Sequence, residues 1–115
     1  MGGVVSFSRS PEDTWLVAGW AFRQLLEDVG KQYAYDVDVV EALKSAKLHD
    51  GLMLELLEPS LADRVTEAID NVVDGILNNT IRSGIEDQPY GDKVTIKQYF
   101  EALTELSGVI KRRRR

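Results

Sequence analysis

The feature that most constrains the fold is a helix-start signal that occurs three times along the chain. The signals are residues 10–13 (SPED), 60–63 (SLAD) and 95–98 (TIKQ). A serine or threonine can accept hydrogen bonds from the exposed N–H groups of a first helical turn, and an acid or amide three residues later extends the cap. Each signal is followed by apolar residues at helical spacing. The chain is therefore predicted to be built from helices.

The apolar spacing places four helices along the chain. Gly30 and Gly51 stand where the first two should end. Amphipathic helices of this kind bury their apolar faces against one another. The predicted fold class is therefore all-α, a single-domain four-helix bundle-like fold with three long helices and one shorter one. The four helices are expected over residues 11–29, from 36 or 38 to about 50, over 61–79 and over 95–110.

Two short apolar segments leave alternatives open. Residues 52–57 (LMLELL) are too few to assign by period, so they form either a helical turn that continues the second helix past a kink or a short strand. Leucine, methionine and glutamate favour the helix. In a second alternative, residues 4–7 pair with residues 94–96 as a small β-ribbon. No repeat or linker divides the chain, so we expect one helical domain over residues 1–110 and a basic C-terminal tail over 111–115.

The composition excludes several chemistries. The chain has no cysteine, which rules out disulfides, thiolate nucleophiles and thiolate metal sites. Its one histidine, His49, rules out a two-histidine metal site within a single chain. The chain also lacks the phosphate loops, nucleophile elbows and zinc-binding helices that mark common enzyme classes. We therefore expect no metal, no cofactor and no catalysis, and an uncharacterised enzyme is the least supported alternative.

The sequence predicts neither a transmembrane helix nor a secretory signal. It has no run of about 18 apolar residues, and its first segment lacks both a basic stretch and a long apolar stretch. The absence of cysteine suits a reducing compartment. These features together favour a cytoplasmic protein without a transmembrane segment.

The charge is distributed unevenly along the chain. The formal net charge is −5, but five of the 14 basic residues are the last five of the chain, and 19 residues are acidic. An acidic body repels nucleic acid, so only the tail would attract it. The tail is either a frayed end, a contact for nucleic acid or an anionic membrane, or a contact for an acidic protein surface. Its residues are Lys111, Arg112, Arg113, Arg114 and Arg115.

Four carboxylates form an acidic row on the third predicted helix. Asp63, Glu67, Asp70 and Asp74 follow one another at intervals of three or four residues, which places them within about 60° of one another around a helix. Like charges at this spacing oppose helix formation slightly, and no lysine lies within the row. The row is either a solvated face that aids solubility or a protein-binding surface for a basic partner.

Three apolar residues of the first predicted helix lie away from its main apolar face. Leu16 and Trp20 are four residues apart, and Val17 lies beside them. A tryptophan outside the core face either packs against a neighbouring segment of the same chain or belongs to an interface. These three residues are therefore the candidate interface for a homodimer or another partner.

The sequence predicts function only as a class. The leading hypothesis is a non-catalytic, small acidic helical protein that binds another, basic protein through the acidic row, as regulators, inhibitors and toxin-immunity proteins do. The rival hypothesis is a nucleic-acid-associated helical module that uses the basic tail. The first predicts that charge reversal of the row abolishes partner binding. The second predicts that removal of the tail abolishes nucleic-acid binding.

Overall fold

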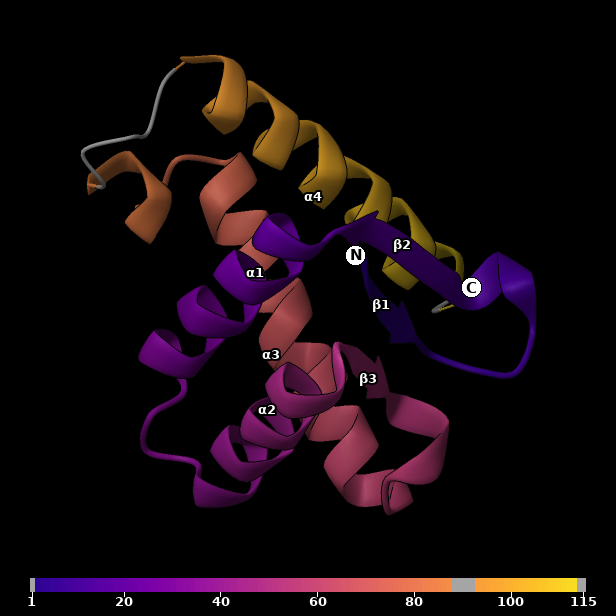
Figure 1. Ribbon diagram of the computed structural model, residues 1–115. Coiled ribbons are helices and arrows are strands. Elements are labelled where there is room, and N and C mark those ends of the chain that lie inside the picture. Colours follow the sequence, from indigo (N-terminus) through magenta and orange to yellow (C-terminus); the bar gives the residue numbers. More distant parts are fainter. Residues whose placement is uncertain (1, 88–92, 114–115) are drawn as a thin grey trace.

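Four helices pack around a small three-stranded sheet in the computed structural model, which describes residues 2–87 and 93–113 (Figure 1). The protein thus has an α/β fold. The helices are α1 (Gly19–Gln32), α2 (Val37–His49), α3 (Pro59–Leu77) and α4 (Lys93–Arg113). The strands are β1 (Gly2–Ser6), β2 (Thr14–Ala18) and β3 (Gly51–Met53). Short 3₁₀ helices lie at Pro11–Asp13, Leu54–Leu56 and Gly84–Asp87.

The sheet overturns the all-α prediction, because residues 14–18 form a strand rather than part of a helix. Burial alternates along β2: Trp15 is buried and Leu16 is exposed, which is the period of a strand. Strand β1 lies in the centre of the sheet, antiparallel to β2 and parallel to β3. Its backbone groups therefore find partners on both sides. A four-helix bundle is the wrong description of this fold.

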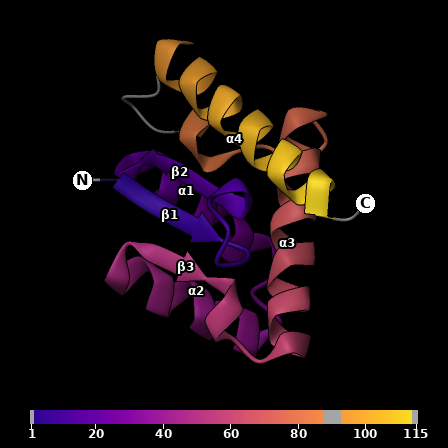
Figure 2. The same cartoon turned by 90° about the vertical axis from the view of Figure 1, so that its right-hand side faces the viewer.

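One face of the sheet joins it to the helices. Val5 of β1 lies opposite Trp15 of β2 and Leu52 of β3, and all three side chains are buried. The Trp15 indole N–H also donates a hydrogen bond of 2.9 Å to the carbonyl oxygen of Ala102 in α4. Figures 1 and 2 show α1 against the sheet, α4 on the β2 side and α2 on the β3 side. The hydrophobic core therefore lies between the sheet and the helices.

The other predicted helices are confirmed with shifted ends. The Asp36 carboxylate caps α2 by accepting a hydrogen bond of 3.3 Å from the Val39 N–H. α3 and α4 cover the third and fourth predicted helices. The first helix begins at residue 19 instead of 11 and continues through Gly30 to residue 32, so this glycine is not the predicted C-cap. Asp50, with a left-handed φ of 52°, ends α2 in place of Gly51.

Both short apolar segments differ from the predictions. Residues 51–53 form β3 and residues 54–56 form a 3₁₀ helix, so the helical turn favoured for residues 52–57 is only partly correct. The β-ribbon alternative is wrong, because β1 pairs with β2 and β3 while residues 94–96 belong to α4. Strand β3 forms because of tertiary pairing rather than local propensity. One edge of β1 pairs with β2, and the chain leaving α2 pairs with the other edge.

Gly3 is a position in the sheet that has no room for a side chain. A Cβ atom added there would overlap with the Cβ and Cγ atoms of Phe22, a buried residue of α1. We expect Gly3→Ala to lower the free energy of unfolding by about 1–2 kcal/mol, because a packed core must shift to admit the methyl group. Urea denaturation measures this loss.

Gly108→Ala is the control for the Gly3 variant. A Cβ atom at Gly108, in the interior of α4, meets nothing within 4 Å. Because alanine restricts the unfolded chain and favours a helix, this variant should be at least as stable as the native protein. Equal losses of stability at Gly3 and Gly108 would contradict the packing argument.

Candidate functional site

The structure divides the acidic row of α3 into an exposed half and a covered half. Asp63 and Glu67 are exposed, whereas Asp70 is buried, with 5% of its surface accessible. Asp74 is half-buried, and its carboxylate lies 3.5 Å from the Lys111 ammonium of α4. α4 crosses the C-terminal half of α3 (Figure 2), which brings Lys111 to Asp74. Of this row, Asp63 and Glu67 are the carboxylates that remain fully exposed to a partner.

Three residues of the predicted basic tail contact the protein's own surface. α4 continues to Arg113, which is helical rather than part of a frayed end. Lys111 is held by α3, and the Arg113 guanidinium lies 3.0 Å from the Asp13 carboxylate. Arg112 reaches a backbone carbonyl oxygen of the same 3₁₀ helix at 3.4 Å. The last two residues, 114–115, lie outside the described residues. A nucleic acid would have to compete with these contacts for three of the five cations.

The three residues of the predicted interface do not form one patch. Leu16 is 74% exposed on the outer face of the sheet, while Val17 points to the opposite face because side chains alternate along a strand. Val17 and Trp20 line a groove between β2, the start of α1 and α4. The Trp20 ring packs against Tyr99, with 6.2 Å between the ring centres. Trp20 therefore has a packing partner within the chain, and Leu16 lies on a separate surface.

A cluster of ion pairs between α2 and α3 extends the exposed half of the acidic row. Arg64 of α3 donates hydrogen bonds of 3.2 and 3.3 Å to the Asp36 carboxylate and one of 3.1 Å to Asp38. The Asp38 hydrogen bond, followed by the charge of Asp36, raises the pKa of the Arg64 guanidinium above its ordinary value. Asp63 and Glu67 neighbour Arg64 on the same helix. We define the acidic surface as the carboxylates of Asp36, Asp38, Asp63 and Glu67.

A hollow with aromatic walls lies within the acidic surface. The Tyr33 and Tyr35 rings lie 5.7 Å apart, and the Asn71 amide donates a hydrogen bond of 2.8 Å to the Tyr33 hydroxyl. Tyr35 is 79% exposed. The hollow has a volume of about 380 Å³, and it combines exposed aromatic surface with carboxylates, which fits a cationic side chain. It is lined by Tyr33, Tyr35, Asp36, Arg64, Glu67 and Asn71.

The sequence predicts the exposed carboxylates of α3 but misses the rest of this site. Nothing in the sequence places residues 33–38 beside residues 64–71, because that proximity depends on how α2 packs against α3. The available signal was local: two tyrosines, at 33 and 35, and two aspartates, at 36 and 38, lie within six residues. Tyrosine is enriched in binding surfaces.

A second cluster of polar residues lies inside the protein. Burial raises the pKa of the Tyr99 hydroxyl far above its ordinary value of 10.0, and the charge of Asp28 raises it further. The side chains of this cluster are almost fully enclosed, namely those of Asp28, Ser83 and Tyr99. We therefore interpret the cluster as a link between α1, the 3₁₀ helix at 84–87 and α4 rather than as a catalytic site. The Asp28 carboxylate accepts hydrogen bonds from the Gln24 amide at 3.1 Å, the Ser83 hydroxyl at 3.0 Å, the Gly84 N–H at 3.1 Å and the Tyr99 hydroxyl at 2.7 Å.

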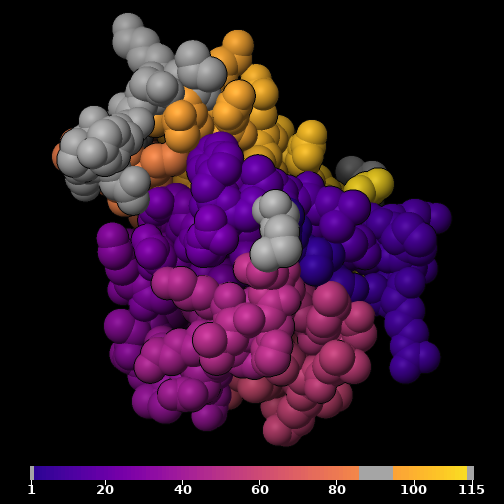
Figure 3. Space-filling view, viewed as in Figure 1, coloured from indigo at the N-terminus to yellow at the C-terminus, as the bar shows by residue number. Residues whose placement is uncertain are grey.

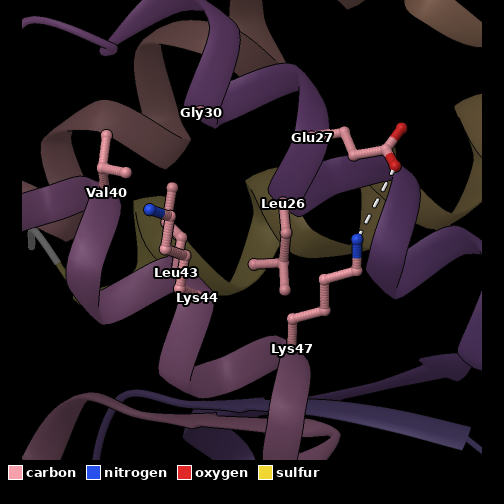
Figure 4. A pocket seen from close by; sticks show the side chains of 7 residues that line it. All are labelled: Leu26, Glu27, Gly30, Val40, Leu43, Lys44 and Lys47. Carbon is pink, nitrogen blue, oxygen red and sulfur yellow. Dashed lines mark ion pairs between the residues drawn. The ribbon is translucent and has the colours of Figure 1, made fainter.

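A third feature is a cleft between α1 and α2, with a volume of about 180 Å³. In the space-filling view, α1 (purple) lies above α2 (magenta) on this face (Figure 3). Figure 4 shows the Lys47 ammonium directed toward the Glu27 carboxylate, from which it lies 4.0 Å. The lining residues are Leu26, Glu27, Gly30, Val40, Leu43, Lys44 and Lys47.

Residues 2–87 and 93–113 contain neither a metal-ligand cluster nor a membrane-spanning helix. In these ranges, no group of three or more histidine, cysteine, aspartate or glutamate side chains is placed to hold a metal ion. Among the helices of the same ranges, none is both long and apolar enough to cross a membrane. No protein-family model, curated protein or solved structure matches the chain.

Proposed function

We propose that this protein is a non-catalytic binding protein that regulates or inhibits a basic partner protein by occupying it through the acidic surface. The hollow beside Tyr35 carries the proposal, because an exposed aromatic ring and carboxylates from two elements line the same space. An arginine or lysine of the partner would meet the ring face and the Glu67 carboxylate together. A solvated helix face offers charge but no such recess.

The charge of the acidic surface is only partly neutralised within the protein. The Arg64 guanidinium is engaged by two of the four carboxylates, Asp36 and Asp38. Within the part of the chain that the structure describes, Asp63 and Glu67 form no ion pair. Unpaired carboxylates of this kind speed the encounter with a basic protein and disfavour an acidic one.

The test is affinity capture from cells that contain the protein, with the native chain and two charge-reversed variants side by side. Asp63→Lys/Glu67→Lys reverses the exposed pair on α3. We expect the native protein to capture a basic protein in stoichiometric amount and this variant to retain about a tenth of it or less, because like charges would then face each other across the interface. Mass spectrometry identifies the captured protein, and circular dichroism confirms that the variant is folded.

Glu101→Lys/Glu105→Lys is the matched control, because it reverses an exposed pair of the same spacing on α4. This control should capture the same protein as the native chain. Tyr35→Ala tests the hollow without a change of charge and should weaken capture at all salt concentrations. Equal capture by the native protein and Asp63→Lys/Glu67→Lys would overturn the proposal. Capture of nucleic acid alone, lost when residues 111–115 are removed, would support the rival hypothesis instead.

A further inference from the structure

The cleft between α1 and α2 has the walls of a small-ligand site. Leu26 and Leu43 are buried at its base, and Val40 is half-buried beside them. Its volume of about 180 Å³ is comparable to that of engineered apolar cavities, about 150 Å³, which bind benzene. A short alkyl chain or an aromatic ring therefore fits the space.

Gly30 leaves the cleft open on the α1 side. It lies inside a helix, where glycine is less favourable than alanine. Its φ is not positive, so no turn of the backbone requires a glycine there. A Cβ atom added to Gly30 would meet nothing within 4 Å. A larger side chain at this position would consequently extend into the cleft that Gly30 lines.

Two lysines stand at the mouth of the cleft. Lys44 and Lys47 lie three residues apart on α2, and both line the cleft. Each ammonium has a carboxylate neighbour at 4.0 Å, Glu41 for Lys44 and Glu27 for Lys47, and this distance is too long for a hydrogen bond. Neither ammonium donates a hydrogen bond to another described residue. Their N–H donors are therefore available to an anionic group.

We propose that this cleft binds a small amphipathic carboxylate, whose hydrocarbon part lies against Leu26, Val40 and Leu43. The carboxylate then lies beside the Lys44 ammonium, which Figure 4 shows on the Val40 side of the cleft, away from the Lys47 ammonium and Glu27. An apolar interior with a cationic rim is the complement of such an anion. Because Glu27 also lines the mouth beside Lys47, we expect Lys44 to supply the larger share of the charge preference.

The proposal is tested by NMR titration of the native protein with three probes of equal chain length that differ in the head group. The probes are octanoate, octan-1-ol and octylammonium, each used below its micelle-forming concentration. We expect octanoate to bind saturably and to shift the methyl signals of Leu26, Val40 and Leu43. Octanol should bind more weakly, and the Kd of octylammonium should be about tenfold higher than that of octanoate.

Two glycine variants provide a matched comparison for the position of the site. Gly30→Leu places a side chain in the cleft and should abolish the methyl shifts. Gly108→Leu introduces the same side chain at an open, helix-interior position of α4 that does not line the cleft, so the Kd of octanoate should be unchanged. Lys44→Gln should weaken octanoate binding severalfold and leave octanol binding as it is, because the variant removes the charge and keeps most of the apolar stem.

Three results would overturn this inference. Equal affinity for octanoate and octylammonium would exclude an anion-selective site. Methyl shifts that persist in Gly30→Leu would place the binding elsewhere, and the absence of shifts in the native protein would exclude a ligand of this class. Each of these outcomes is independent of the acidic surface, so the failure of one proposal leaves the other unaffected.

Discussion

Asp28→Ala is expected to lower the free energy of unfolding by about 3–5 kcal/mol, a large part of the stability of a domain of this size. The variant removes one acceptor but leaves several donors in place. The Ser83 hydroxyl, the Gly84 N–H and the Tyr99 hydroxyl all donate to this carboxylate. Each buried polar group that loses its partner costs about 1–3 kcal/mol. The loss therefore exceeds the effect of the shorter side chain alone.

Urea denaturation followed by circular dichroism measures this loss. Asp74→Ala is the matched control, because it removes a carboxylate from another helix where the partner, Lys111, is largely exposed. Partly exposed ion pairs contribute little, so the control should cost about 1 kcal/mol or less. If Asp28→Ala destabilised the protein no more than Asp74→Ala, the buried cluster would not be what holds α1 to α4.

The N-terminal part of the fold could not be predicted from apolar spacing, because the same residues fit two periods. Trp15 and Ala18 lie on the helical stripe of the first predicted helix, yet residues 14–18 also alternate as a strand. Leu16 and Val17 are the residues that a helix leaves unexplained, and β2 explains both, since they point to opposite sides of the sheet. The deciding information is nonlocal, because a strand at 14–18 requires β1 as its partner.

The helices from α2 onward could be predicted because their signals are local. A capping carboxylate precedes α2, and the apolar stripe of α3 is buried as its period requires. The exposure of the acidic row could not be predicted in the same way. Asp70 and Asp74 share a face with Asp63 and Glu67 on an isolated helix, yet Asp70 is buried and Asp74 is half-buried beside Lys111 of α4. Helical geometry gives the direction of a side chain, and a packed neighbour decides whether that side chain meets solvent.

A second large effect is expected at alkaline pH, because Tyr99 stays neutral in the folded protein. Burial, and then the adjacent Asp28 carboxylate, raises the pKa of Tyr99 far above 10.0. In the unfolded chain the same hydroxyl ionises near its ordinary pKa of about 10. Above that pH the unfolded state therefore binds fewer protons than the folded state. The contribution of Tyr99 to the free energy of unfolding is thus complete below pH 10 and is lost as the pH rises. The loss grows from about 1 kcal/mol at pH 11 to about 3 kcal/mol at pH 12.

Comparison of the native protein with Tyr99→Phe isolates this effect. Phenylalanine cannot ionise, but it lacks the hydrogen bond of 2.7 Å to Asp28, so at about pH 8 the variant should be less stable by about 1.5–3 kcal/mol. Urea denaturation between about pH 8 and pH 12 should show this difference shrinking above pH 10, because only the native protein carries the Tyr99 titration while all other groups are shared. A stability difference that stayed constant over this range would mean that Tyr99 ionises as readily inside the fold as outside it. A difference near zero at about pH 8, by contrast, would mean that the contact with Asp28 is not what fastens α4 to α1.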